Sequence, residues 1–364
     1  MPETNLTDDD LRHGYAGRTC LVTGADGFVG SHLVDALVDF GADVHAFIRA
    51  TSSGELRNIG HLAGGVRVHR GNLMDQTSVR TVVRALRGGR DPIVFHLGAQ
   101  AHVGESWERP YDTVGTNVIG TLNLLQSFID EDVPLFKFDT AGTSEEYGNV
   151  HADFKEQHDY HEGSLLLHER SPLNPKSIYA TAKVAADFLT MNYFDAYGLP
   201  TVTTRMFNNY GPRQNPRYVT GTIITQALGR DEVRLGALRP KRDFCHVRDG
   251  VRGHLHVALA GHAGEVYVYG QGENVSIGDW ADLILKVGRD TDLLRPGCRV
   301  VDDQARYRPG KSDVEELLVG YEKLHRLTGW EPRLTWEEGL ADTIRWYAEN
   351  RDTWIGRVDW RQPD

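Results

Sequence analysis

Tyr179 and Lys183 stand four positions apart in the stretch SIYATAKVAADFLTMNYFDAYG. If the stretch is a helix, this spacing places both side chains on one face. An ammonium group beside a phenol stabilises the phenolate, so the tyrosine can act as a general base near neutral pH. The same pair also arises by chance as an exposed aromatic–cation contact. The interpretation therefore depends on a reacting centre nearby.

A second candidate group lies in DTAGTSEEYGNV, residues 139 to 150, where Thr143 and Ser144 precede two adjacent carboxylates. One of Glu145 and Glu146 could be a catalytic base, or the stretch could be a polar loop that closes off a strand. If Glu145 faces a ligand, Glu146 points elsewhere in an extended or turning backbone. We therefore interpret Glu146 as structural or solvated.

The elements that would position these groups begin with RTCLVTGADGFVGSHLVDALVDFGADVHAFIRA. A short apolar run at 20–23 predicts a buried parallel strand, the apolar periodicity after residue 30 predicts a helix, and 44–48 predicts a second strand. Gly24, Gly27 and Gly30 separate the first strand from the helix. Such a turn lets a pyrophosphate approach backbone N–H groups at the helix N-terminus, so the unit predicts a dinucleotide site.

Arg49 ends the second strand, about where an acidic residue would bind a ribose 2′-hydroxyl in an NAD site. An arginine there, followed by Thr51, Ser52 and Ser53, could instead hold a 2′-phosphate. The alternative is a solvated loop arginine. The residue weakly favours NADP, and NAD stays open.

Strand and helix patterns continue to alternate through VRVHRGNLMD, PIVFHLGAQAHV, NVIGTLNLLQSFID and PLFKFDTAGTSEEYG. This alternation predicts a doubly wound α/β fold, with ligands beyond the carboxyl ends of parallel strands. The stretch with Glu145 leaves the sheet on that side. The cofactor-binding residues expected there are Gly24, Gly27, Phe28, Val29, Gly30, Arg49, Asn72, Leu73, Leu97, Gly98, Ala99, Thr140, Tyr179 and Lys183.

Composition excludes several other classes. The formal net charge of −11 argues against nucleic acid binding, which needs a concentrated basic surface. Cys20, Cys245 and Cys298 are far apart, so neither a disulfide framework nor a zinc ribbon is indicated, and a reducing cytoplasm fits best. No apolar run approaches the length of a membrane span. The polar residues 1–16 are unlike a signal peptide, and we expect a flexible leader.

The segment from 151 to 177 is loop-like and contains His151, His158, His161 and His168. Their spacing fits no usual metal-ligand pattern. We expect a polar lid or insertion here, and no metal.

Taken together, these motifs resemble the extended short-chain dehydrogenase/reductases that act on nucleotide sugars. The resemblance covers nearly everything from Arg18 to about Asn350. The shared motifs include VTGADGFVGSHL, VFHLGAQ, GTSEEYG, PLNPKSIYATAK, RMFNNYGPRQ, RDFCHVRDG and LTGWEPRLTWEEGL. It implies a Rossmann-like NAD(P) domain over 17–205 plus about 240–270. A smaller, discontinuous nucleotide-sugar domain would take about 206–239 plus 271–364.

Within that family the closest pattern is that of nucleotide-sugar 4,6-dehydratases. The resemblance implies that Tyr179 takes the proton of the sugar C4 hydroxyl, that Lys183 lowers the pKa of the tyrosine, and that Thr143 hydrogen-bonds the C4 oxygen. Glu145 would abstract the C5 proton as the C6 hydroxide leaves. Ser144 stands where dTDP-glucose dehydratases have an aspartic acid that protonates the leaving group, so the identity of that acid stays open.

Two other activities on the same fold stay open, 4-epimerisation and decarboxylation of UDP-glucuronate. The absence of a glutamate at this position in most simple epimerases counts against the first. The resemblance also implies a homodimer that packs the Tyr179 helix and the 117–130 helix against their mates. For the substrate diphosphate, the expected residues are Asn208, Arg213, Arg242 and Arg308.

Overall fold

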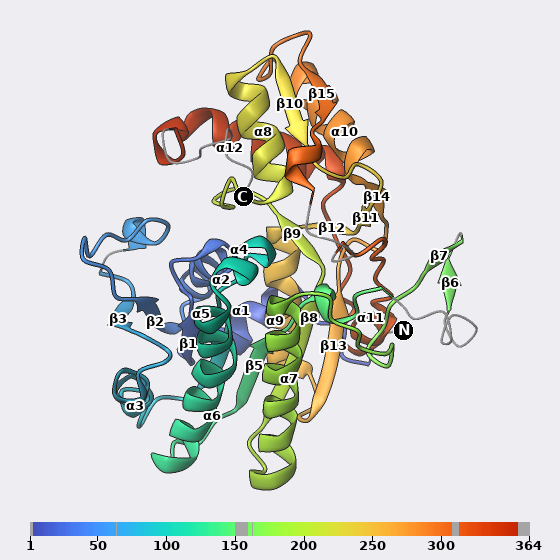
Figure 1. The fold of residues 1–364 in the computed structure, drawn as a ribbon. Helices are drawn as coiled ribbons and strands as arrows, with labels where there is room; N and C mark the ends of the chain where they lie inside the picture. Colours follow the sequence, from blue (N-terminus) through green and yellow to red (C-terminus); the bar gives the residue numbers. More distant parts are fainter. Residues whose placement is uncertain (1–2, 63, 150–158, 162, 308–312, 356–364) are drawn as a thin grey trace.

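The computed structural model describes the chain except residues 1–2, 63, 150–158, 162, 308–312 and 356–364. Its centre is a parallel sheet of seven strands in the order β13-β8-β5-β4-β1-β2-β3 (Figure 1). The predicted doubly wound fold is confirmed. The strands are β1 Thr19–Thr23, β2 Asp43–Arg49, β3 Arg67–Gly71, β4 Ile93–His96, β5 Lys137–Ala141, β8 Thr201–Met206 and β13 Glu265–Tyr269.

Helices cover both faces of the sheet because its strands are apolar on both sides. In β1, Cys20 and Val22 join the hydrophobic core on one face, whereas Leu21 joins the core on the other. The first face is covered by α1 Asp8–Tyr15, α2 Phe28–Asp39 and α9 Val247–Ala260. The second is covered by α3 Gln76–Arg84, α6 Gly120–Asp130 and α7 Ile178–Tyr197.

A smaller part of the molecule lies beyond the carboxyl ends of the strands, at the top of Figure 1. It has its own core, in which Trp280, Ile284, Leu340 and Tyr347 are buried. This separate core supports the proposed two-domain division. The part is built from β9 Asn208–Tyr210, α8 Val219–Gly229, β10 Glu232–Leu235, β11 Lys241–Arg242, β12 Phe244–His246, β14 Val275–Ser276, α10 Ile277–Asp290, β15 Arg299–Asp302 and α12 Trp336–Glu349. The helix α11 Glu322–Thr328 packs instead on strand β13 of the large sheet.

The prediction of a flexible leader over residues 1–16 is wrong for the residues that the structure describes. Thr7 and Asp10 form a capping box that starts α1, and the apolar side chains Leu11 and Tyr15 are buried in the core shared with α9. The Tyr15 hydroxyl donates to the carbonyl of Leu255 over 2.7 Å. The segment is ordered because Leu11 and Tyr15 find partners in a helix far along the chain.

The histidine-rich segment forms a short antiparallel hairpin, β6 Tyr160–His161 and β7 Ser164–Leu165, which projects from the side of the molecule in Figure 1. His161 is exposed on it, His168 receives a hydrogen bond from the backbone of Arg170, and His151 and His158 lie outside the described residues. Among the described residues no group of three His, Cys, Asp or Glu side chains could hold a metal ion. Within the same residues no helix is both long and apolar enough to cross a membrane.

Candidate active site

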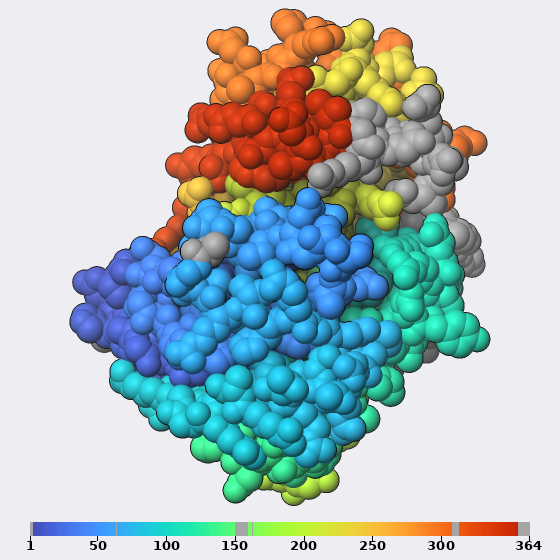
Figure 2. All heavy atoms as spheres, turned by 90° about the vertical axis from the view of Figure 1, so that its left-hand side faces the viewer, coloured from blue at the N-terminus to red at the C-terminus, as the bar shows by residue number. Residues whose placement is uncertain are grey.

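A single cavity of about 2010 Å³ lies between the sheet and the smaller part. Figure 2 shows the two parts meeting across the molecule, N-terminal residues in blue and cyan below and C-terminal residues in red and orange above. The cavity is lined both by the glycine turn and by Thr143, Glu145 and Tyr179. A dinucleotide bound at the turn and a substrate beside Glu145 would therefore share one cavity.

The glycine turn has the shape that close backbone approach requires. Gly24 has a φ of 68°, and a Cβ on it would lie 2.9 Å from the Cα of Gly98. A Cβ on Gly30 would lie 2.3 Å from the carbonyl oxygen of Gly24. Glycine is therefore required at positions 24 and 30 of the turn between β1 and α2, and the residues present fit a dinucleotide whose pyrophosphate rests at the N-terminus of α2.

The loop after β4 forms a further part of the cavity wall. Asn117, in a π-helical stretch between α5 Pro110–Val114 and α6, accepts a hydrogen bond from the Gln100 backbone over 2.8 Å and donates to the Gln100 carbonyl over 3.0 Å. It thereby fixes the loop after β4. The predicted cofactor residues that border the cavity are Gly24, Gly27, Phe28, Val29, Gly30, Arg49, Asn72, Leu73, Leu97, Gly98, Ala99 and Tyr179.

Two of the predicted cofactor residues lie behind the cavity wall. Thr140 is buried, and its hydroxyl bonds to that of Thr190 on α7 over 2.8 Å, so it ties the sheet to the helix. Lys183 is also buried, and its ammonium donates to the carbonyl of Ala141 over 2.6 Å. Burial lowers the pKa of Lys183 to about 8, against the opposing charge of Glu146.

Tyr179 and Thr143 face one another at the exit of β5. Burial raises the pKa of the Tyr179 phenol well above its usual range, the nearby Tyr218 adds to this, and a hydrogen bond with the Thr143 side chain acts in the opposite direction. The structure thus brings these two residues from distant segments together. The phenol can act as a base only when a positive charge beside it, from a ligand or from the Lys183 ammonium, lowers its pKa.

Glu145 and Glu146 take different directions in a 3₁₀ turn, Ser144–Glu146. The Thr143 hydroxyl accepts from the backbone N–H of Glu145 over 3.3 Å, and Glu145 borders the cavity. Glu146 is fully buried and does not border it. The prediction that the side chains of Glu145 and Glu146 point in different directions is confirmed. Of the two interpretations of Glu146, structural or solvated, its burial supports the structural one.

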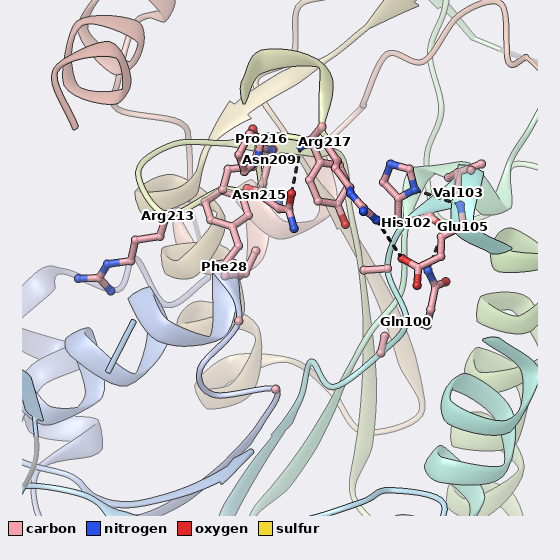
Figure 3. A pocket seen from close by; sticks show the side chains of 18 of the residues that line it. Phe28, Gln100, His102, Val103, Glu105, Asn209, Arg213, Asn215, Pro216 and Arg217 are labelled. Atoms are coloured by element: carbon pink, nitrogen blue, oxygen red, sulfur yellow. Dashed lines mark hydrogen bonds and ion pairs between the residues drawn. The ribbon is translucent and has the colours of Figure 1, made fainter. Parts of the chain in front are cut away.

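Two arginines that border the cavity on the substrate side, Arg213 and Arg217, are each paired with a carboxylate. Arg213 has a φ of 68° and pairs with Asp35 of α2 at 2.6 Å, and Figure 3 shows its side chain pointing away from Arg217 and Glu105. Arg217, which the site prediction omitted, extends toward Glu105 at 4.0 Å. The sequence carried no signal for the pairing of Arg213 with Asp35, because Asp35 lies far away in the chain.

Of the remaining predicted substrate residues, Asn208 and Arg242 border the cavity, and Arg308 is outside the described residues. Arg242 borders the cavity and donates to the carbonyl of Val314 over 2.8 Å. Asn208 also borders it, and its side-chain oxygen is buried without a hydrogen-bond partner within the described part of the chain. A buried polar atom of this kind favours a ligand that can pair with it.

Comparison with known proteins places the chain among enzymes of nucleotide-sugar chemistry. The model of the family described as GDP-mannose 4,6 dehydratase matches residues 21–343. The dTDP-glucose 4,6-dehydratase of Streptomyces niveus is 33% identical over 344 residues, which are 92% of this chain and 94% of that protein.

Solved structures agree with this placement. The dTDP-glucose 4,6-dehydratase DesIV of Streptomyces venezuelae, solved with NAD bound, superposes with a TM-score of 0.79 at 29% identity, covering 93% of this chain and 100% of that chain. A UDP-glucose 4-epimerase of Thermus thermophilus in complex with NAD gives 0.76 at 30% identity, covering 91% of this chain and 99% of that one.

Proposed function

The chain belongs to the GDP-mannose 4,6 dehydratase family, and from that premise we propose that it is a nucleotide-sugar 4,6-dehydratase. Its substrate is a nucleoside-diphosphate hexose, and its product is the 4-keto-6-deoxy sugar. The observation that carries the proposal is the shared cavity, in which Glu145 stands beside Thr143 and Tyr179 and beside a glycine turn fit for a dinucleotide.

A nicotinamide dinucleotide, when bound, supplies the redox chemistry by taking up the C4 hydrogen with its electron pair and giving it back to C6. Tyr179 removes the proton of the C4 hydroxyl, and Thr143 holds the C4 oxygen. The ketone that forms acidifies the hydrogen at C5, which Glu145 removes as a proton. The C6 hydroxyl takes up a proton and leaves as water, and a proton returned to C5 completes the balance.

Incubation with nucleoside-diphosphate hexoses tests this function. Mass spectrometry should detect a product lighter than one substrate by one water, without net consumption of the dinucleotide. Among the substrates, dTDP-glucose and GDP-mannose should be tested first, because the relatives carry these names. A C4 epimer as the sole product, or carbon dioxide from a uronic acid substrate, would contradict the proposal.

The cofactor preference follows from Arg49, which is exposed at the end of β2 and borders the cavity. If it binds a 2′-phosphate, Arg49→Ala weakens NADP roughly tenfold, as loss of a charge-assisted hydrogen bond does, and leaves NAD nearly unchanged. Fluorescence titration with both dinucleotides measures this. Arg67→Ala is the matched control, because Arg67 pairs with Asp43 at 3.2 Å outside the cavity. Equal weakening of both dinucleotides by Arg49→Ala would refute a 2′-phosphate contact.

A homodimer is the assembly that the exposed apolar residues favour. Ile119 is 45% exposed and Phe188 on α7 is 52% exposed, together with Val114 and Tyr111 at the adjoining α5. Phe188→Glu should convert a dimer to a monomer in light scattering. The control Tyr160→Glu, equally exposed on the β6–β7 hairpin, should not. A wild-type monomer would disprove the assembly.

A further inference from the structure

Glu146 is a fully buried carboxylate beside the proposed catalytic residues, and nothing in the proposed reaction uses it. One of its oxygens, Oε1, accepts the backbone N–H of Thr143 over 2.8 Å. The other, Oε2, lies 3.2 Å from Nε of Arg205 on β8. Its backbone carbonyl accepts from the N–H of Asn174 over 3.0 Å. The side chain therefore closes the turn on one side and reaches the sheet on the other.

Arg205 carries the connection to the helix with Tyr179 and Lys183. Its Nε and Nη2 both donate to Oδ2 of Asp187 on α7, over 2.8 and 2.6 Å. Asp187 lies one helical turn after Lys183, on the same face. Arg205 also donates to the hydroxyl of Tyr147 over 3.1 Å. All of these groups are buried, so water does not compete for the contacts.

Gly142 leaves room for the contact between Glu146 and Arg205, because it has no side chain. A Cβ there would lie 2.7 Å from Oε1 of Glu146 and 3.0 Å from Cγ of Arg205. Burial and the neighbouring Asp187 raise the pKa of Glu146, while Arg205 opposes them. Arg205 thus pairs with both Glu146 and Asp187. Removing either partner would leave a buried charge or dipole without its pair.

We propose that Glu146 is a positioning residue. Through Arg205 and Asp187 it fixes the turn that holds Thr143 and Glu145 against the helix that holds Tyr179 and Lys183. The two halves of the reacting centre come from separate elements, and a displacement of about 1 Å between them can cost about 10²-fold in rate. The proposal rests on the proposed function for the identity of the reacting groups.

The test compares Glu146→Ala and Glu146→Gln with the control Glu131→Ala. Glu131 is also a buried carboxylate with arginine partners, Arg80 at 2.7 Å and Arg84 at 2.7 Å, but it ends α6 far from the cavity. The rate constant for reduction of the bound nicotinamide is measured in a single turnover by absorbance. A rate constant does not depend on the fraction of folded enzyme, whereas the amplitude does.

We expect Glu146→Ala to lower that rate constant by roughly 10²-fold. Glu146→Gln should lower it less, because its amide oxygen still accepts from Thr143. Glu131→Ala should lower thermal stability and leave the rate constant unchanged. A wild-type rate constant in Glu146→Ala would overturn the proposal. If Glu146→Ala does not fold, a wild-type rate constant in Glu146→Gln would overturn it.

A second readout does not depend on turnover. Crystal structures with bound dinucleotide should show the 143–146 turn displaced from Tyr179 in Glu146→Ala, or in Glu146→Gln if the alanine variant does not fold, but not in Glu131→Ala. An unmoved turn would refute the positioning role.

If the wild type reduces its nicotinamide but forms an epimer or carbon dioxide, the dehydratase function fails and the positioning role stands, because C4 oxidation precedes all three outcomes. If no sugar is oxidised, the crystal structures alone decide the role of Glu146.

Discussion

Glu145→Gln is expected to stop the loss of water while the sugar is still oxidised at C4. The amide has nearly the size of the carboxylate and cannot remove the C5 proton, and loss of a general base typically costs 10²–10⁴-fold, so turnover should fall by about that factor. Glu145 borders the cavity next to Thr143, and its side chain is not part of the Glu146 connection. The variant should therefore fold and bind as the wild type does.

Rapid mixing with substrate would show the block directly. Absorbance of reduced nicotinamide should rise in Glu145→Gln and persist, because the step that consumes it is blocked. Mass spectrometry should find no 4-keto-6-deoxy product. The matched control is Glu105→Gln, a carboxylate on α4 Val103–Glu108 that also borders the cavity. Product formation at the wild-type rate by Glu145→Gln would remove this residue from the mechanism.

Tyr179→Phe is expected to stop the reaction one step earlier. Phenylalanine keeps the ring in its buried place and removes the hydroxyl that takes the C4 proton. The oxidation rate should fall by about 10²–10⁴-fold, and no reduced nicotinamide should accumulate. The dissociation constant of the dinucleotide should change little. The control Tyr193→Phe removes another α7 hydroxyl, which donates to Gln126 over 2.6 Å away from the cavity.

The two variants together order the steps. Glu145→Gln should accumulate the reduced cofactor and Tyr179→Phe should not. The combined variant Tyr179→Phe with Glu145→Gln should behave as Tyr179→Phe alone, since the earlier block decides what accumulates. Accumulation of reduced nicotinamide in Tyr179→Phe would assign the C4 proton to another group.

Local sequence patterns predicted much of this architecture, because the residues that form each pattern lie close together in the chain. The glycine turn is indicated by the spacing of Gly24, Gly27 and Gly30 between a strand and a helix, and Gly24 has the φ of 68° that favours glycine. The pair Tyr179 and Lys183 lies on one face of a helix, as its spacing alone implies. The serine that starts α10, Ser276, caps the helix by accepting from the backbone of Asp279.

What the sequence could not predict depends on partners far along the chain. Leu11 and Tyr15 become buried only because α9 lies beside them, so α1 did not stand out from a polar leader. The direction of Arg213 is decided by Asp35. Glu146 can be buried because Arg205, on β8, lies 3.2 Å from one of its oxygens. Its neighbour Glu145 has the same side chain but borders the cavity. Only the geometry of the 3₁₀ turn separates the positions of the two glutamates.

In the proposed reaction, one hydrogen moves within the substrate from C4 to C6 while water is lost. A nucleoside-diphosphate hexose carrying deuterium at C4 tests it in ordinary water. The proposed function predicts a 4-keto-6-deoxy product that keeps the deuterium at C6, with a hydrogen from solvent at C5. Deuterium that remains at C4 in an epimer, or a product that has lost carbon dioxide, would contradict it.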